Sequence, residues 1–165
     1  MGEIGEVWNA VKDVVTLFGS GQSQAMGQRA FACPQGVQPG GLDWSNAQEH
    51  QLQYTLNITN NAREWFGLST GCSLRMGCIW QYGGTSAQHP GLYLHDAYLW
   101  AVLDYSSAGT NFTVTGSFGD AVPVGNSAEL SGQIQMTMTY CGMHWEQRQF
   151  DIRIRGNGYG VMRQI

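Results

Sequence analysis

The stretch AELSGQIQMTMTY, residues 128–140, is the longest alternation of apolar and polar side chains in the chain. Its apolar positions are Leu130, Ile134, Met136, Met138 and Tyr140. Its polar positions are Glu129, Ser131, Gln133, Gln135, Thr137 and Thr139. Because successive side chains of a β-strand point to opposite faces of a sheet, this period of two predicts a strand with one buried face.

The same period recurs through the rest of the chain from residue 50 onward. It is found, between turn-forming residues, in residues 50–58, 74–80, 112–118 and 145–155. The run from Tyr98 to Leu103 is apolar on both faces, which is typical of a central strand. These stretches predict a mainly β fold, an antiparallel β-sandwich or barrel of about seven to eight strands. The glycine-rich residues 156–160 are expected to close the chain loosely.

Residues 3–18, EIGEVWNAVKDVVTLF, follow a different period. Apolar side chains recur at intervals of three and four, which predicts one amphipathic helix over residues 1–19 that ends at Gly19. The apolar stripe of this helix comprises Ile4, Val7, Trp8, Val11, Val14, Val15 and Phe18. The charged residues Glu3, Glu6, Lys12 and Asp13 fall on the water-facing side.

The helix and the strands are separated by residues 20–49, which are rich in Gly, Ser and Gln. This composition predicts a flexible or irregular connection, with a short strand from Ala30 to Cys33. The expected organisation is a single domain, in which the helix (1–19) and the connection (20–49) precede a β-sandwich (50–165). A flexible connection would let the helix leave the sandwich, whereas a helix packed on a sheet edge is the more usual arrangement.

Charge is scarce in this chain. Charged residues make up 12% of the sequence, about half the usual share, and the net charge is −4. Phosphate binding needs a concentrated basic patch, so the sequence argues against nucleic acid as a partner. The polar surface must come from Gln, Asn, Ser, Thr and Gly, which suits uncharged polar partners such as sugars, zwitterionic headgroups or other copies of the chain.

No pattern for catalysis, a cofactor or a metal stands out. The chain has no Gly-x-Ser-x-Gly elbow, and His144 with Glu146 supplies only two of the four ligands of a zinc site. We therefore expect a protein that is not an enzyme and has neither a metal nor a cofactor. Four cysteines allow three pairings, and the disulfide state of Cys33, Cys72, Cys78 and Cys141 stays open. No signal peptide or span of ~20 apolar residues is visible.

The aromatic residues offer the clearest candidate binding contacts. Tyrosine and tryptophan have an apolar body and a polar tip, so they suit sugar faces and membrane headgroups. Five of them lie at predicted strand ends or loops: Trp65, Tyr82, Tyr93, Trp145 and Tyr159. For each one individually, packing at the end of a sandwich is the more common role.

An amphipathic helix at the front, a flexible connection and a β-sandwich with loop aromatics together resemble the actinoporin-like pore-forming toxins. The resemblance covers the order of elements over most of the chain. It lacks two motifs of the family, an aromatic-rich loop of Pro-Tyr-Asp type and Arg-Gly-Asp. The resemblance implies a homo-oligomer that binds zwitterionic membrane and inserts its helix to line a pore. It also implies a secreted protein, or one acting at an extracellular target membrane, that is released without a visible signal peptide.

Two other functions fit the same residues. One is a self-assembling structural subunit of a filament, shell or virion, in which the helix docks on a neighbouring copy. The other is a carbohydrate-binding β-sandwich, in which the helix only packs. Whether the apolar stripe is covered in the monomer discriminates between the pore and the assembly. A cluster of exposed aromatics beside Asp, Asn or Gln would favour sugar binding.

Overall fold

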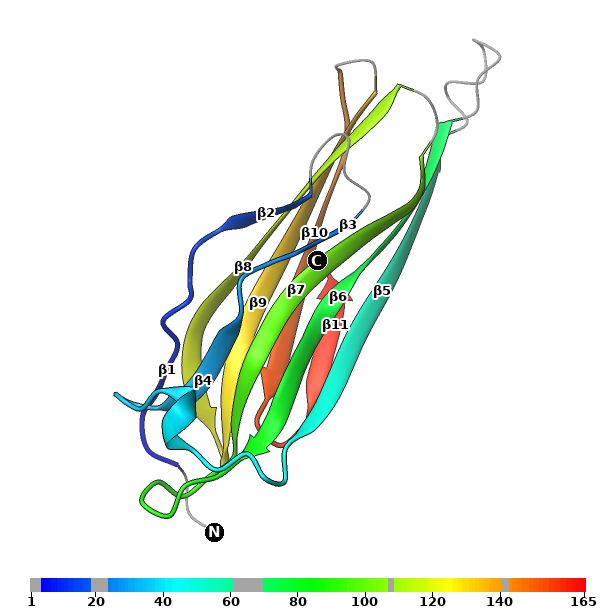
Figure 1. The fold of residues 1–165 in the computed structure, drawn as a ribbon. Coiled ribbons are helices and arrows are strands. Elements are labelled where there is room, and N and C mark those ends of the chain that lie inside the picture. The colour runs from blue at the N-terminus through cyan, green and yellow to red at the C-terminus, as the bar shows by residue number, and fades with distance from the viewer. Residues whose placement is uncertain (1–3, 19–23, 61–69, 107–108, 141–142) are drawn as a thin grey trace.

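Two antiparallel β-sheets face each other along the length of the molecule in the computed structural model (Figure 1). The structure describes residues 4–18, 24–60, 70–106, 109–140 and 143–165. The first sheet has the order β1 (Val7–Trp8), β4 (Ala30–Pro34), β7 (Tyr93–Ser106), β6 (Thr70–Gly84) and β5 (Gln48–Asn60), and β3 (Gln24–Met26) also pairs with β7. The second has the order β11 (Gly160–Gln164), β10 (Met143–Arg155), β9 (Ser127–Tyr140), β8 (Thr110–Val124) and β2 (Val15–Phe18).

The predicted mainly β fold is confirmed, and its form is a sandwich because neither sheet closes into a barrel. The described residues form eleven strands, more than the seven to eight expected, because short strands in residues 4–34 and at 160–164 add to the long ones. In β9 the apolar side chains Leu130, Ile134, Met136 and Met138 are fully buried, as the alternation predicts. The predicted central strand is β7, which lies between β4 and β6. The inward faces of the two sheets supply a single core.

The predicted N-terminal helix is wrong. Residues 4–18, which we call the N-terminal strap, run extended: β1 pairs with β4 in the first sheet and β2 pairs with β8 in the second. The strap therefore crosses from one sheet to the other along one side of the sandwich (Figure 1). Backbone pairing at two sheet edges outweighs a helical preference that four valines already weaken.

The side chains of the strap also depart from the predicted apolar stripe. Ile4 and Val7 are buried, Trp8, Val11 and Val15 are half-buried, and Val14 is 70% exposed. Leu17 and Asn9, which the helical pattern leaves off the stripe, are both buried. Glu6, Lys12 and Asp13 are exposed as predicted, whereas Glu3 and the side chain of Phe18 lie outside the described residues.

Two other expectations about connections need correction. The segment from 20 to 49 is not irregular throughout, because it holds β3, β4 and a 3-10 turn at Pro39–Gly41. The chain does not close loosely after residue 155 either, because a tight turn leads into β11. The short strand predicted from Ala30 to Cys33 is confirmed as β4. Among the residues that the structure describes, no helix is long and apolar enough to cross a membrane.

The extended conformation of the strap predicts that substitutions at Leu17 and Val14 differ in their effect on stability. Replacing the fully buried Leu17 with alanine should lower the free energy of unfolding by about 2–4 kcal/mol, because it removes core contacts and leaves a cavity. The matched Val14→Ala change, at an exposed position, should cost under ~0.5 kcal/mol. Urea unfolding followed by tryptophan fluorescence measures both. A helical segment with Val14 on its buried stripe would reverse the order.

Candidate functional site

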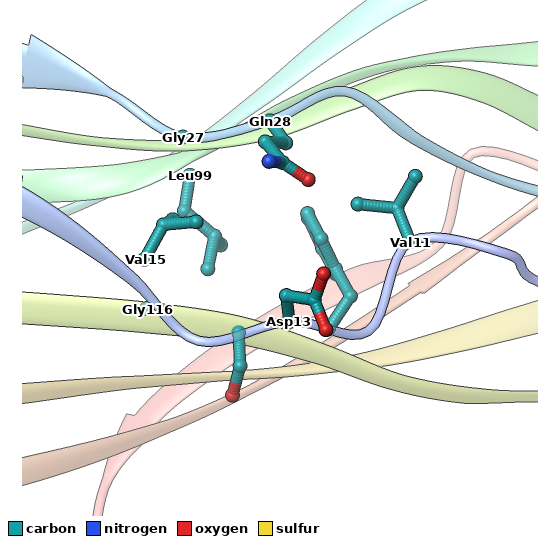
Figure 2. A pocket seen from close by; sticks show the side chains of 9 residues that line it. Val11, Asp13, Val15, Gly27, Gln28, Leu99 and Gly116 are labelled. Carbon is teal, nitrogen blue, oxygen red and sulfur yellow. The ribbon is translucent and has the colours of Figure 1, made fainter.

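The cleft under the N-terminal strap is the first place where a ligand could be sought. Val11 and Val15 of the strap face Gly27, Leu99 and Gly116 across it (Figure 2). Its volume is about 10 Å³, which is room for about one water. A Cβ atom at Gly116 would lie 2.7 Å from Leu99 Cδ1, so the glycine lets the strap and both sheets close on one another. This cleft is a packing seam.

A larger cavity of about 240 Å³ opens where the strap meets the end of β4 and the loop before β7. It is lined by Gly5, Glu6, Pro34, Gln35, His89, Pro90 and Tyr93. Tyr93, predicted as a headgroup or sugar contact, is buried, and its hydroxyl donates to the carbonyl of Pro90 at 2.9 Å. Burial, and then the nearby Cys33 thiol, raise the pKa of Tyr93. The phenol therefore holds the loop and forms part of the cavity wall.

Two of the predicted aromatic contacts, Tyr82 and Tyr159, come together at the turn between β10 and β11. The ring of Tyr82 lies 2.8 Å from where a Cβ atom at Gly158 would stand, and its hydroxyl donates to Gln48 Oε1 at 2.9 Å. His50 Nδ1 lies 2.8 Å from the carbonyl oxygen of Gly158. These contacts tie the turn of the second sheet to β5 and β6 of the first. Trp65 and the side chain of Trp145 lie outside the described residues.

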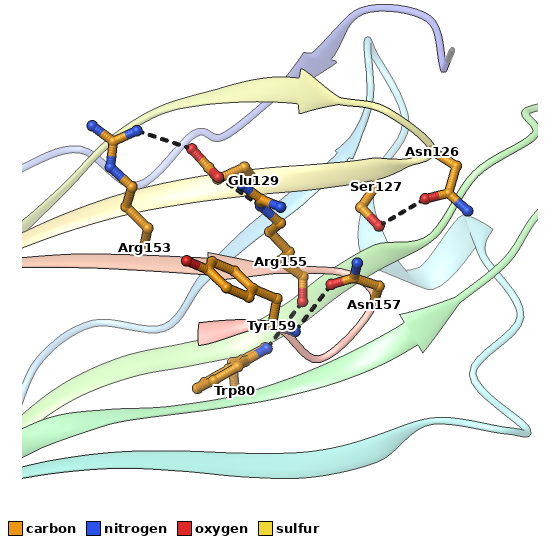
Figure 3. A network of polar contacts seen from close by, with 8 residues as sticks. All are labelled: Trp80, Asn126, Ser127, Glu129, Arg153, Arg155, Asn157 and Tyr159. Carbon is orange, nitrogen blue, oxygen red and sulfur yellow. Dashed lines mark hydrogen bonds and ion pairs between the residues drawn. The ribbon is translucent and has the colours of Figure 1, made fainter. Parts of the chain in front are cut away.

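A carboxylate between two arginines lies beside the same turn (Figure 3). Glu129 is 5% exposed, accepts from Arg155 Nε at 2.8 Å and lies 3.5 Å from Arg153 Nη1. The guanidinium of Arg155 stacks over the ring of Tyr159 at 4.4 Å. Trp80 Nε1 donates to the carbonyl of Arg155 at 3.2 Å. One face of the exposed Tyr159 ring is thus taken by Arg155, which leaves less of it for a sugar.

The sequence patterns missed a second aromatic cluster. Trp44, in the predicted connection, folds back and stacks on His95 of β7 with ring centroids 3.7 Å apart. His95 Nε2 lies 3.0 Å from Gln81 Oε1, and its Nδ1 lies 3.8 Å from Asp96 Oδ2. Burial lowers the pKa of His95, and the Asp96 carboxylate opposes that shift. Asp96 has a φ of 49° and lies within a register shift of the β6–β7 pair, between His95 and Tyr98, so it marks a bulge.

Cysteine and metal chemistry find little support in the described part of the chain. Cys33, Cys72 and Cys78 are buried free thiols, and burial raises the pKa of Cys33 to about 12 and that of Cys72 to about 11. Burial also raises the pKa of Cys78. Cys141 lies outside the described residues. No three His, Cys, Asp or Glu side chains of the described residues converge where a metal ion could bind.

The edge strand β5 is the most unusual surface feature. All thirteen residues from Gln48 to Asn60 pair with β6 without a register shift, and no other strand of the described chain pairs with β5. Its outward side chains are exposed and uncharged at Gln51, Gln53, Thr55 and Asn57. Lysines, prolines and bulges protect the edges of natural sheets, and β5 has none of them.

The other four edge strands of the described chain are short. The strand β1 has two residues, β2 has four, β3 has three and β11 has five. Apolar surface accompanies the long edge: Leu52 and Tyr54 of β5 are half-buried, and Ile165, which follows β11, is 67% exposed. Tyr54 and Gln164 approach across the sandwich, with Oη and Oε1 3.5 Å apart. Unpaired backbone and exposed apolar side chains thus share one side of the molecule.

Two further surfaces are defined by their side chains. On the outer face of the second sheet, Thr113, Thr137 and Gln147 form one uncharged cross-strand row, and Thr115, Gln135 and Gln149 form the next. At one end of the sandwich, Tyr105 of β7 is 58% exposed and Met143 of β10 is 57% exposed. The strands β7 to β10 reach this end together (Figure 1). The first surface is polar and uncharged, and the second is apolar.

No known protein family, curated protein or solved structure matches this chain.

The half-buried His95 predicts a pH dependence of stability. Its pKa is lowered from the usual 6.5 in the folded protein, so the unfolded chain takes up the proton first as the pH falls. The stability from neutral His95 is full above about pH 6.5 and is lost as the pH falls toward the folded pKa. Replacing His95 with glutamine should reduce the loss of unfolding free energy between about pH 7.5 and about pH 5.5.

Thermal and urea unfolding at the two pH values measure this loss. Comparing the change with pH, and not the absolute stability, removes the packing contribution of the Trp44 stack, which the variant loses at both values. If His95→Gln shows the same pH dependence as the unchanged protein, His95 does not contribute to it.

Proposed function

We propose that this protein is a self-assembling structural subunit whose copies associate through an exposed sheet edge. The observation that carries the proposal is β5, a regular edge strand of thirteen residues with no proline, lysine or bulge. Such an edge offers its unpaired N–H and C=O groups to a further strand. Docking through an N-terminal helix has no part in this proposal, because residues 4–18 are extended.

The charge distribution supports association between copies. Between Gln51 and Asn60 no side chain of β5 is charged, so two such edges do not repel each other. The rows of threonine and glutamine on the second sheet are also uncharged. A net charge of −4 on 165 residues gives little long-range repulsion between copies. We therefore expect an association that depends weakly on salt.

A lysine on the open edge should weaken this association. Replacing Thr55 with lysine adds a charge that must be desolvated when a second strand pairs there, which should raise the dissociation constant roughly tenfold, equivalent to ~1.4 kcal/mol. Sedimentation velocity over a range of protein concentrations measures the constant.

The control is Gln88→Lys, an exposed residue of the loop before β7 that lies outside β5 and outside the rows of threonine and glutamine, and it should leave the constant unchanged. A protein that remains a monomer of 18.1 kDa at the highest concentration reached would contradict the proposed function.

A second candidate function, binding to a zwitterionic membrane, is supported by the exposed Tyr105 and Met143. Both lie at one end of the sandwich, where an aromatic ring with a polar tip suits the depth of lipid headgroups. A pore built by helix insertion would first have to break the β1–β4 and β2–β8 pairs.

Charges at this end should abolish membrane binding. In flotation with phosphatidylcholine–sphingomyelin vesicles, the unchanged protein should rise with the lipid, and the Tyr105→Asp, Met143→Asp double variant should stay behind. The control is Val122→Asp, an exposed apolar residue of β8 toward the opposite end, which should still float. An unchanged protein that stays in the soluble fraction would rule out this second function, and dye release from the same vesicles tests for a pore.

A further inference from the structure

We propose that two copies of the chain pair through β5 as antiparallel strands about a twofold axis at Tyr54. This pairing would join their first sheets into one continuous sheet. The inference rests on the proposed function, because it names the contact through which the subunits associate. It commits to a second copy of this chain as the occupant of the open edge.

The length of β5 selects the register. Tyr54 is the middle residue of Gln48–Asn60, so an axis at Tyr54 is the one that pairs all thirteen residues of both strands. It places Gln53 of one copy opposite Thr55 of the other, and Gln51 opposite Asn57. Because these pairs join residues of like parity, the inward side chains Leu52 and Leu56 stay on the buried face. A shift of the axis along the strand would leave residues of both copies unpaired.

The charges on β5 are compatible with this register. Glu49 is the only carboxylate of the strand, and the twofold pairing places it opposite Thr59 of the other copy. His50 falls opposite Ile58. On the neighbouring strands, Arg75 and Asp104 already satisfy each other, with Nε–Oδ2 and Nη2–Oδ1 distances of 2.7 and 2.9 Å. No like charges are brought face to face on β5.

Apolar side chains on the same side of the molecule would add apolar contacts to the backbone hydrogen bonds between the two copies. The half-buried Leu52 and Tyr54 would gain neighbours from the other copy. Across the sandwich, β11 lies against β5, and Ile165 leaves 67% of its surface exposed beside it. Of the described strands, only β6 pairs with β5, while β11 lies across the sandwich from it, so in the described part of the chain the outer edge of β5 is open to a partner strand.

A charge-swap experiment tests the contact and its register together. One variant carries Gln53→Lys and Thr55→Lys, and a second carries Gln53→Glu and Thr55→Glu. In the proposed register each variant alone places like charges directly opposite at two positions, which should raise its dissociation constant about a hundredfold. Mixing the two variants places opposite charges at both positions, and heterodimers should form within about tenfold of the original affinity.

Native mass spectrometry of the mixture distinguishes heterodimers from homodimers, because the two variants differ in mass. The control is Asn111→Lys with Thr113→Lys, the same two charges on exposed positions of β8, and it should dimerise normally. Heterodimers in the mixture also show that both variants are folded. Far-ultraviolet circular dichroism of each variant gives an independent check.

The outcomes separate this inference from the proposed function. If the double-lysine variant associates as tightly as the unchanged protein, the contact between copies lies elsewhere and the β5 pairing is overturned, whereas self-assembly through another surface stands. If the single variants dissociate but the mixture forms no heterodimer, the register is wrong. If the unchanged protein is a monomer throughout, both proposals fall.

Discussion

The pairing of backbone groups at the sheet edges is the constraint on which the rest of this structure depends. Each sheet leaves N–H and C=O groups unpaired along its two outermost strands. The N-terminal strap supplies the outermost strand of both sheets on one side, as β1 beside β4 and β2 beside β8. It also joins the sheets, since the Asn9 amide donates to the Gly119 carbonyl at 3.2 Å and Lys12 pairs with Asp120. On the other side the second sheet ends in the short β11 and the first in β5, the only long edge of the described chain.

The same constraint explains which parts of the fold could be predicted from sequence. Along residues 128–140 the period of the side chains and the tertiary environment agree, so the strand and its buried face followed directly. In the strap they disagree. The three-and-four spacing of its apolar residues fits a helix, but Ile4, Val7 and Leu17 are buried by packing against strands far away in sequence. The Asn9 side chain donates a hydrogen bond to the carbonyl of Gly119, which is 110 residues away in the sequence. A local sequence pattern cannot indicate that two distant sheet edges have unpaired backbone groups with which this segment can pair.

For the candidate sites as well, the sequence predicted some features and could not predict others. Tyr82 and Tyr159 were predicted at strand ends or loops, and both lie at the turn between β10 and β11. The Tyr82 ring packs against Gly158 in the seam between the sheets, whereas the Tyr159 ring stacks with Arg155. Glu129 and Arg155 occupy predicted outward positions of two strands. Only the register, which pairs them across β9 and β10, shows that the carboxylate is buried between arginines. The Trp44–His95 stack could not be predicted from the sequence. Trp44 lies in a connection without periodic alternation, so no pattern indicates which way its side chain points. That β5 is an edge strand follows only from the order of strands in the sheet, which the local alternation of side chains does not reveal.

The number of open edges limits what kind of assembly this chain can form. A contact made by the same strand on both copies is isologous, and it closes after two copies because each edge is then paired. A filament or shell therefore needs a second, different surface. The outer face of the first sheet carries Arg75–Asp104 and the stack of Arg29 over Tyr98, so it is charged. The rows of threonine and glutamine on β8 and β9 present neither charge nor unpaired backbone edge. It follows that backbone pairing through β5 would build the dimer, and weaker contacts between these uncharged rows would join the dimers to one another.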